Sequence, residues 1–237
     1  MKPTPRILIV GAQHGTERLG PRVYRFIQRH HPEKLAYIDY LCGNPKAERQ
    51  HLRFVETDLN RSYDATIPRS YEEKRAQKIL ERISAGTYDY VLDIHTSFTD
   101  VDRFLITARM DKTIQEIISA SPFSRVVVMP PHIASSALIG HVPQAVSIEY
   151  NNVLARSHQA LQEVLLLLDN LIQRQFMPQF RDIFYVEDKI PLDSDFDIDS
   201  PNFQLCPQGF YPVIAGRGVT YTHYKGFAAR TKEAVVM

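Results

Sequence analysis

The sequence predicts an α/β fold, with a mixed, mostly parallel sheet, helices on both faces and a small C-terminal β-rich domain. Short continuous apolar runs, typical of strands buried on both faces of a parallel sheet, alternate with segments whose apolar residues recur at helical spacing. After residue 178 this alternation gives way to short β-type runs containing proline, glycine and aromatic residues. We therefore expect an α/β domain over residues 1–178 and a small β-rich domain over residues 179–237.

The first expected strand, Ile7–Val10, ends at a glycine and is followed by a loop. A helix is expected to begin at Gly20-Pro21, because proline suits the first helical turn. A second strand is expected over residues 35–42. The segment beyond it, from residue 43 past Pro68, has few periodic apolar residues and reads as a long loop, and ordered loops of this length usually carry function.

The next helix is marked by Ser70-Tyr71-Glu72-Glu73, which has the pattern of a capping box, and it should end near Gly86. Further strands are expected at residues 90–95, 104–106, 126–129 and 145–149, with helices around 114–118 and over 153–176. The β-type runs of the C-terminal part are residues 183–186, 210–214 and 219–224.

Composition and charge exclude several classes of protein. The chain has 237 residues with 28 basic and 27 acidic side chains, so no strong overall field favours nucleic acid or an anionic membrane. Two cysteines cannot form a disulfide framework, and the first residues lack the apolar stretch of a signal peptide. We expect a cytoplasmic protein without a nucleic-acid or membrane partner, for which a homo-oligomer remains open.

Polar residues that could bind a metal follow two of the expected strands. His14 and Glu17 lie three residues apart in a glycine-flanked turn, and His95 ends a later strand. Ligand sites of open α/β sheets form beyond the carboxyl ends of strands, and two histidines with one glutamate suit a catalytic zinc ion. Asp93 shares a strand face with His95 and could orient its imidazole. From spacing alone, unrelated loop and core histidines are an equal alternative.

Further motifs resemble the succinylglutamate desuccinylase and aspartoacylase family, within the zinc carboxypeptidase fold. Its long signature loop is similar to Asn44-Pro45-Lys46-Ala47, Arg53-Phe54 and Asp58-Leu59-Asn60-Arg61. The segment with its catalytic glutamate resembles Ser147-Ile148-Glu149-Tyr150, and the tail of its C-terminal β domain resembles Tyr211-Pro212-Val213 followed by Thr220-Tyr221.

That resemblance implies a role for each matching residue. His14, Glu17 and His95 would bind one zinc ion. Glu149 would be the general base and acid, and Arg53 would polarise the scissile carbonyl. Asn60 and Arg61 would bind a substrate carboxylate, with Tyr221 also at the substrate site. These roles suit amide hydrolysis, which needs an activated water, a proton carrier and a cation for the negative oxygen.

The chain also departs from the family pattern. Aspartoacylase-like enzymes have a further arginine shortly before the strand of the catalytic glutamate, but residues 133–144 contain none, and His141 is the one possible cation there. Ala215-Gly216-Arg217 stands where the family has an acidic residue. We therefore expect a pocket that reads one carboxylate, with His141 as the alternative partner for a second.

The leading hypothesis is a zinc-dependent hydrolase that cleaves the amide bond of an N-acyl amino acid or a similar small carboxylate-bearing compound. A carboxypeptidase that acts on peptides is a second enzyme hypothesis, because the same fold and metal set serve peptide substrates. A zinc-bearing binding protein without turnover is a third. Glu149 and Arg53 favour an enzyme, since a binding protein has no need for a base beside an oxyanion donor.

Overall fold

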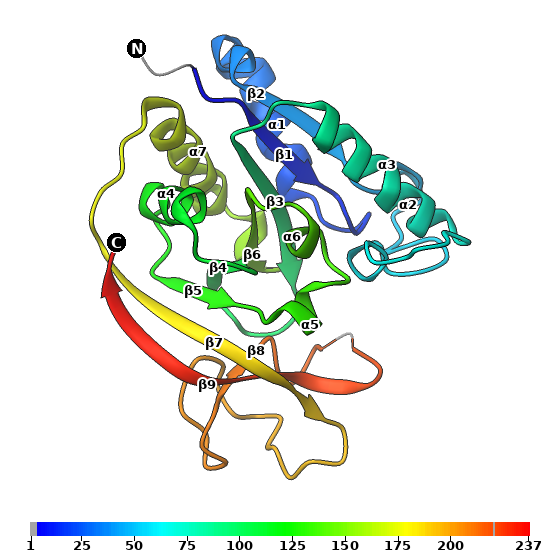
Figure 1. Ribbon diagram of the computed structural model, residues 1–237, viewed down its shortest axis with the longest axis vertical. Helices are drawn as coiled ribbons and strands as arrows, with labels where there is room; N and C mark the ends of the chain where they lie inside the picture. The colour runs from blue at the N-terminus through cyan, green and yellow to red at the C-terminus, as the bar shows by residue number, and fades with distance from the viewer. Residues whose placement is uncertain (1–3, 220) are drawn as a thin grey trace.

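The described part of the chain, residues 4–219 and 221–237 of a computed structural model, contains one nine-stranded sheet. Its order is β2-β1-β3-β6-β4-β5-β7-β9-β8 (Figure 1). The strands are β1 (Ile7–Gly11), β2 (Ile38–Cys42), β3 (Tyr90–Ser97), β4 (Arg103–Thr107), β5 (Arg125–Val128), β6 (Ala145–Asn151), β7 (Phe180–Pro191), β8 (Tyr211–Val213) and β9 (Tyr224–Val236). Strands β2, β1, β3 and β6 are mutually parallel, and β4 pairs antiparallel with β6. The predicted mixed, mostly parallel sheet is confirmed.

Helices cover both faces of this sheet, as predicted. One face packs against α1 (Leu19–His30), α4 (Lys112–Ala120) and α7 (His158–Gln173). The other packs against α3 (Tyr71–Ala85), α5 (Pro131–Ala134) and α6 (Leu138–His141). Along β1, Ile7 and Ile9 enter the first core and Leu8 and Val10 the second. Coverage on both faces is the physical reason why the strand sequences are continuously apolar.

Several helix boundaries follow from capping. Helix α3 begins with the predicted capping box, in which Ser70 Oγ accepts from the backbone N–H of Glu73 and the Glu73 carboxylate accepts from that of Ser70. The long helix expected over residues 153–176 is wrong at its start. Residues 154–156 form a 3₁₀ turn, and α7 begins only after Ser157, whose hydroxyl accepts from the Ala160 N–H.

Two other expectations need correction. The expected long loop contains α2 (Pro45–Gln50), which Asn44 caps by accepting from the Ala47 N–H, and a 3₁₀ turn at Leu59–Arg61. The strand expected over residues 219–224 is absent at Val219 and residues 221–223, because Gly216 and Gly218, with φ of +95° and +84°, turn the chain there. Thr220 lies outside the described residues.

The C-terminal part is β-rich, as predicted, and it extends the main sheet. Strand β7 pairs parallel with β5, and the long β9 pairs antiparallel with β7. Figure 1 shows these two strands as a curved ribbon with the loops after β7 at its far end. We call residues 180–236 the C-terminal ribbon. Because β7 continues the sheet, the division into two domains at residue 178 stays a prediction.

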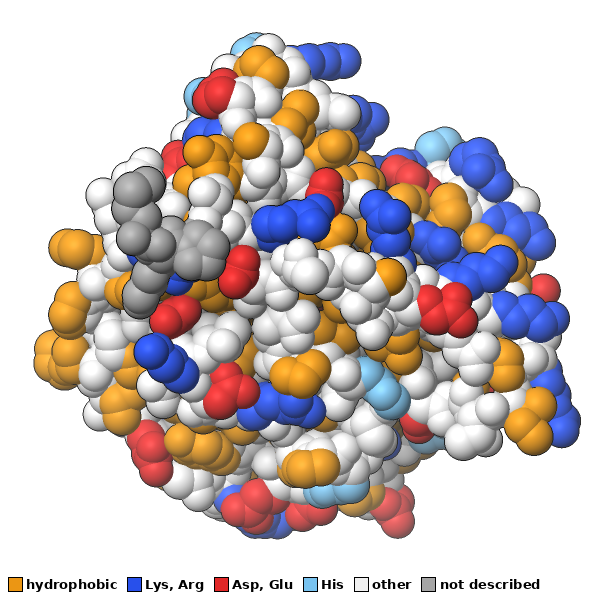
Figure 2. All heavy atoms as spheres, turned by 45° about the horizontal axis from the view of Figure 1, so that its top comes forward, with side chains coloured by type: hydrophobic (Ala, Val, Ile, Leu, Met, Phe, Trp, Pro, Cys, Tyr) orange, Lys and Arg blue, Asp and Glu red, His pale blue; other side chains and the backbone are white. Residues whose placement is uncertain are grey.

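One face of the molecule carries side chains of both charges. On the face drawn in Figure 2, acidic and basic side chains are interspersed with apolar ones. Among the described residues, every helix is too short or too polar to cross a lipid bilayer.

Candidate active site

The candidate site lies where the parallel strands β1, β3 and β6 end. His14 and Glu17 follow β1, and His95 lies near the end of β3. In the register of β3 and β6, His95 is directly beside Glu149, and Asp93 is beside Ser147. The topology therefore brings together four residues that are up to 135 positions apart in the sequence, on one edge of the sheet.

His14, Glu17 and His95 form a buried cluster with a suitable atom of each within 4.8 Å of the others. Glu17 lies between the rings, with Oε1 at 2.8 Å from His14 Nδ1 and Oε2 at 3.3 Å from His95 Nδ1. All three side chains are at most 6 % exposed. The three residues proposed from the sequence as metal ligands are thus the ones that the fold brings together.

The outer nitrogen of each ring contacts a carboxylate. His14 Nε2 lies 2.9 Å from Asp58 Oδ1, and His95 Nε2 lies 2.8 Å from Asp93 Oδ2. Nε2 therefore carries the proton in the neutral rings, and each Nδ1 presents a lone pair to Glu17, which is itself an acceptor. Such contacts are repulsive unless a proton or a metal ion lies between the atoms. Burial opposes the charged form of His95, but Asp93 and Glu17 outweigh it and raise the pKa of His95 well above its usual value.

Glu149 is the acidic group next to this cluster. Its side chain is 7 % exposed, and burial, partly offset by the nearby imidazoles and Arg53, raises the pKa of Glu149 to about 7. A carboxyl group with such a pKa is suited both to accept and to release a proton near neutral pH.

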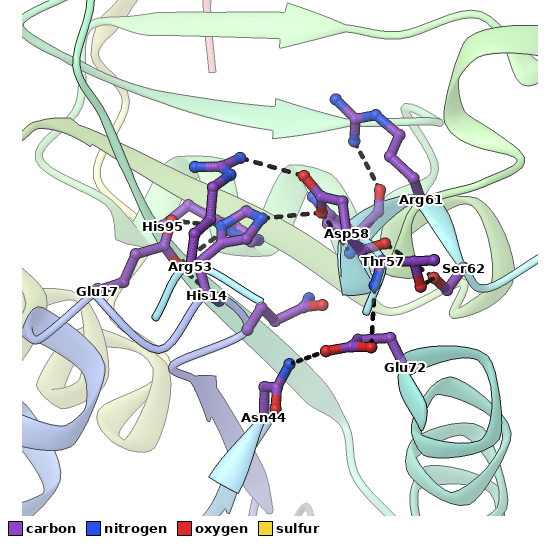
Figure 3. A network of polar contacts seen from close by, with 12 residues as sticks. His14, Glu17, Asn44, Arg53, Thr57, Asp58, Arg61, Ser62, Glu72 and His95 are labelled. Atoms are coloured by element: carbon purple, nitrogen blue, oxygen red, sulfur yellow. Dashed lines mark hydrogen bonds and ion pairs between the residues drawn. The ribbon is translucent and has the colours of Figure 1, made fainter. Parts of the chain in front are cut away.

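A loop that runs from α2 to Arg61 supplies the polar groups on the second side of the cluster (Figure 3). Arg53 and Arg61 arise from this loop on either side of Asp58. Arg53 Nη2 donates to Asp58 Oδ2 at 3.2 Å, so Asp58 joins His14 to Arg53. The turn after β1 packs closely on α2: a Cβ atom at Gly15 would lie 2.2 Å from the backbone carbon of Ala47.

The same loop is anchored from below by Glu72, the second residue of α3. Its carboxylate accepts four hydrogen bonds, from the backbone N–H groups of Val55 (2.7 Å), Glu56 (3.1 Å) and Thr57 (3.1 Å) and from Asn44 Nδ2 (3.0 Å). Glu72 is fully buried. This carboxylate fixes the segment immediately before Asp58 and connects it to the cap of α2.

One pocket combines the cluster with nearly all of the expected site residues. Among the expected residues, Asp93, behind His95, and His141 are outside its lining. The others all contribute to it: His14, Glu17, Arg53, Asn60, Arg61, His95, Glu149 and Tyr221. A large part of the remaining lining is apolar: Ile106, Met129, Ile133, Ala134, Ala137 and Ile139. Residues 133–139 thus contribute apolar side chains in the segment where, by the resemblance stated above, aspartoacylase-like enzymes have a further arginine.

His141 does not line this pocket. Its Nε2 atom lies 2.5 Å from the carbonyl oxygen of Ser135, and its ring is beside that of Tyr63. The expectation that His141 contacts a second substrate carboxylate is therefore wrong, because the imidazole at the end of α6 contacts the backbone of Ser135 instead.

The structure adds three residues that the sequence interpretation did not single out. Asp58 contacts His14, Glu72 anchors the loop, and Lys189 of β7 lines the pocket. Asp58 belongs to the Asp58-Leu59-Asn60-Arg61 motif, but the sequence does not show that it contacts His14, which is 44 positions away. No local pattern marks Glu72 or Lys189.

Comparisons with known proteins agree with this geometry. A family model described as "Succinylglutamate desuccinylase/Aspartoacylase catalytic domain" matches residues 3–138. An aspartoacylase of Xenopus tropicalis is 33 % identical over 135 residues, which are 48 % of this chain and 42 % of that protein. An N-acyl-aromatic-L-amino acid amidohydrolase (carboxylate-forming) of Rattus norvegicus is 29 % identical over 121 residues, 45 % of this chain and 38 % of that protein. The chain thus spans about two fifths of the length of these curated relatives.

The fold is also that of solved structures. The crystal structure of murine aminoacylase 3 superposes with a TM-score of 0.72 at 18 % identity, covering 100 % of this chain and 98 % of that one. A succinylglutamate desuccinylase from Chromobacterium violaceum superposes with a TM-score of 0.69 at 13 % identity, covering 99 % of this chain and 86 % of that one. Since the family model spans more than half of the sequence and its signature residues meet at one site, the chain belongs to the succinylglutamate desuccinylase/aspartoacylase catalytic domain family.

Proposed function

We propose that the protein is a zinc-dependent hydrolase that cleaves the amide bond of N-acyl amino acids or similar small carboxylate-bearing compounds. The observation that carries this proposal is the cluster of His14, Glu17 and His95 beside the buried Glu149. The named activities of the relatives, aspartoacylase and N-acyl-aromatic-L-amino acid amidohydrolase, support the same class of reaction.

The residues fit a zinc ion. The two Nδ1 atoms and the Glu17 carboxylate lie next to one another, and Asp58 and Asp93 contact the outer ring nitrogens. Imidazole with one carboxylate is a donor set that zinc favours, and outer carboxylates commonly orient such imidazoles. When bound, zinc would supply a water of lowered pKa and polarise a carbonyl oxygen. We propose one zinc ion per chain at this cluster.

The protein's own groups would carry out the remaining steps. Glu149 would accept the proton of the attacking water and deliver it to the leaving amine, a role that suits a buried carboxyl group beside His95. Arg53, held by Asp58, would stabilise the negative oxygen that develops on the scissile carbonyl. Both roles require only that the substrate amide lie in the pocket that these side chains line.

Arg61, Asn60 and Tyr221 would bind the substrate carboxylate. In the described residues 4–219 and 221–237, Arg61 makes no ion pair with an acidic side chain, and its guanidinium lies over the ring of Tyr221 at 5.6 Å. A planar guanidinium without an acidic partner is suited to a carboxylate. Both cysteines are free, and the cytoplasmic location expected from their number stays a prediction.

The test is a hydrolysis screen with the zinc-loaded protein. N-acetyl and N-succinyl amino acids, together with short peptides, are incubated and the released amine is quantified. We expect turnover of N-acyl amino acids that is lost both after metal chelation and in Glu149→Gln. Turnover confined to peptides, or turnover that Glu149→Gln retains, would contradict the proposal.

A further inference from the structure

The pocket contains one cation that the proposed mechanism does not use. Three basic side chains besides the histidines line it, namely Arg53, Arg61 and Lys189. Arg53 is paired with Asp58, and Arg61 is proposed to bind one carboxylate. Lys189 comes from β7 in the C-terminal ribbon, and within the described part of the chain it has no acidic partner. Lys189 is exposed to water, so its charge needs no acidic partner within the protein, and its place in the pocket lining leaves it available to an anion.

Aromatic side chains link Lys189 to Arg61. Lys189 Nζ lies 5.0 Å from the ring centre of Tyr224, and Arg61 Nη2 lies 3.4 Å from the hydroxyl oxygen of the same tyrosine. Tyr224 stacks on Tyr221 at 4.3 Å, and Tyr221 also faces Arg61. Both cations therefore contact the same tyrosine, and both line the same pocket.

Two neighbouring cations repel each other, and the aromatic rings only partly offset this, because cation–π contacts at exposed sites contribute about 0.5–1 kcal/mol. Anionic groups would stabilise the pair far better. A single substrate can contact both Arg61 and Lys189 through anions only if it carries two anionic groups.

The rest of the pocket offers no competing cation for a second anion. Residues 133–139 present apolar side chains, and His141 is bound to its own loop. Arg53 is already engaged with Asp58 beside the cluster. Among the described lining residues, Lys189 is thus the basic group left for a second carboxylate.

We propose that Lys189 determines the charge preference of the pocket by binding a second carboxylate of the substrate. This inference rests on the proposed function for its first carboxylate and its amide. It replaces the one-carboxylate expectation, in which the absent arginine left the second charge unpaired. The second carboxylate can come from the amino-acid side chain or from the acyl group, and isosteric substrate pairs distinguish these sources.

The experiment measures charge selectivity as a ratio of kcat/KM values. N-acetylglutamate is compared with N-acetylglutamine for a side-chain carboxylate, and N-succinylalanine with N-succinamoylalanine for an acyl carboxylate. The ratios are determined for the parent, Lys189→Met, Lys189→Arg and the control Lys78→Met, which removes an exposed lysine of α3 outside the pocket.

We expect the parent to prefer the charged member of at least one pair. Lys189→Met should reduce that preference about fivefold to tenfold, less than the loss of a buried charge-assisted hydrogen bond because Lys189 is exposed to water, and mainly through KM. Lys189→Arg should retain most of it, and Lys78→Met should match the parent. A parent without charge preference in both pairs, or a preference that Lys189→Met retains, would overturn the proposal.

A binding measurement separates this inference from the proposed function. Both substrate pairs are titrated calorimetrically into Glu149→Gln, alone and combined with Lys189→Met. If the parent hydrolyses no N-acyl compound, the proposed function fails. The difference in affinity within each pair still reports on Lys189, and its absence from both pairs in the Lys189-containing protein counts against the inference.

Discussion

Replacing Glu72 with glutamine tests whether one buried carboxylate holds the loop of the candidate site. The substitution preserves the size of the side chain and exchanges one acceptor oxygen for an NH₂ donor. In the structure both carboxylate oxygens only accept, from Val55, Glu56, Thr57 and Asn44. An amide can accept at one atom, so about two of the four donors would face another donor.

The cost follows from those contacts. A buried donor that loses its acceptor costs about 1–3 kcal/mol. Two such donors would cost twice that amount if both were fully buried. Glu56 and Thr57 are exposed residues, however, so water can reach their amides in part and lower the cost. We therefore expect Glu72→Gln to lower the free energy of unfolding by about 2–4 kcal/mol at pH 7.

The pH dependence gives a second readout. Burial alone would raise the pKa of Glu72, but the hydrogen bonds from Val55, Asn44 and the following amides outweigh it and lower this pKa. The stabilisation is thus complete above the ordinary glutamate pKa of about 4.3 and is lost as the pH falls through the lower pKa of the folded state. The difference between parent and variant should shrink in acid, where the parent carboxyl is also neutral.

Urea unfolding at several pH values measures this difference. Glu81→Gln, an exposed glutamate on the same helix, is the matched control and should stay within about 0.5 kcal/mol of the parent. A Glu72→Gln protein as stable as this control, or a loss that does not change between pH 7 and acid, would refute the reasoning.

Four further predictions concern the site. His95→Ala should lose stoichiometric zinc in metal analysis of the folded protein, and retained zinc would show that the ligand set is wrong. Glu149→Gln and Arg53→Ala should each lower kcat at least about a hundredfold with little change in Tm, and near-normal turnover would contradict their roles. Asp58→Asn should weaken zinc binding about tenfold to a hundredfold in a chelator competition, because Asp58 orients His14; an unchanged affinity would count against that contact. His141→Ala should leave the ratio of kcat/KM for N-acetylglutamate and N-acetylglutamine as in the parent, since the ring lies off the pocket, and an altered ratio would reinstate His141 as a substrate contact.

The sequence predicted the parts of the structure that depend on local pattern. The apolar runs at Ile7–Val10 and residues 90–95 predicted strands of a mostly parallel sheet, whose polar ends could meet, although unrelated histidines were an equal alternative from spacing alone. The capping box at Ser70 fixed the start of α3. In contrast, α2 is only six residues long and has little apolar periodicity, so it read as loop.

The contacts between distant segments could not be predicted in the same way. Asp58 reaches His14, and Glu72 reaches the amides of residues 55–57, through a loop whose path no periodicity specifies. Lys189 enters the pocket because β7 pairs with β5 and continues past it. That placement depends on sheet order, which the residue pattern of β7 does not contain.

The C-terminal ribbon has a consequence for how such a protein can diverge. The candidate metal ligands and Glu149 come from β1, β3 and β6 and the loops that follow them. The C-terminal ribbon supplies Lys189, Tyr221 and Tyr224. Under the proposed function, the reacting groups therefore come from the α/β part of the chain, whereas the substrate pocket combines Asn60 and Arg61 of that part with side chains of the C-terminal ribbon. If the proposed function holds, insertions or exchanges in the ribbon would change which acyl amino acid is bound while the candidate metal ligands and Glu149 stay in place.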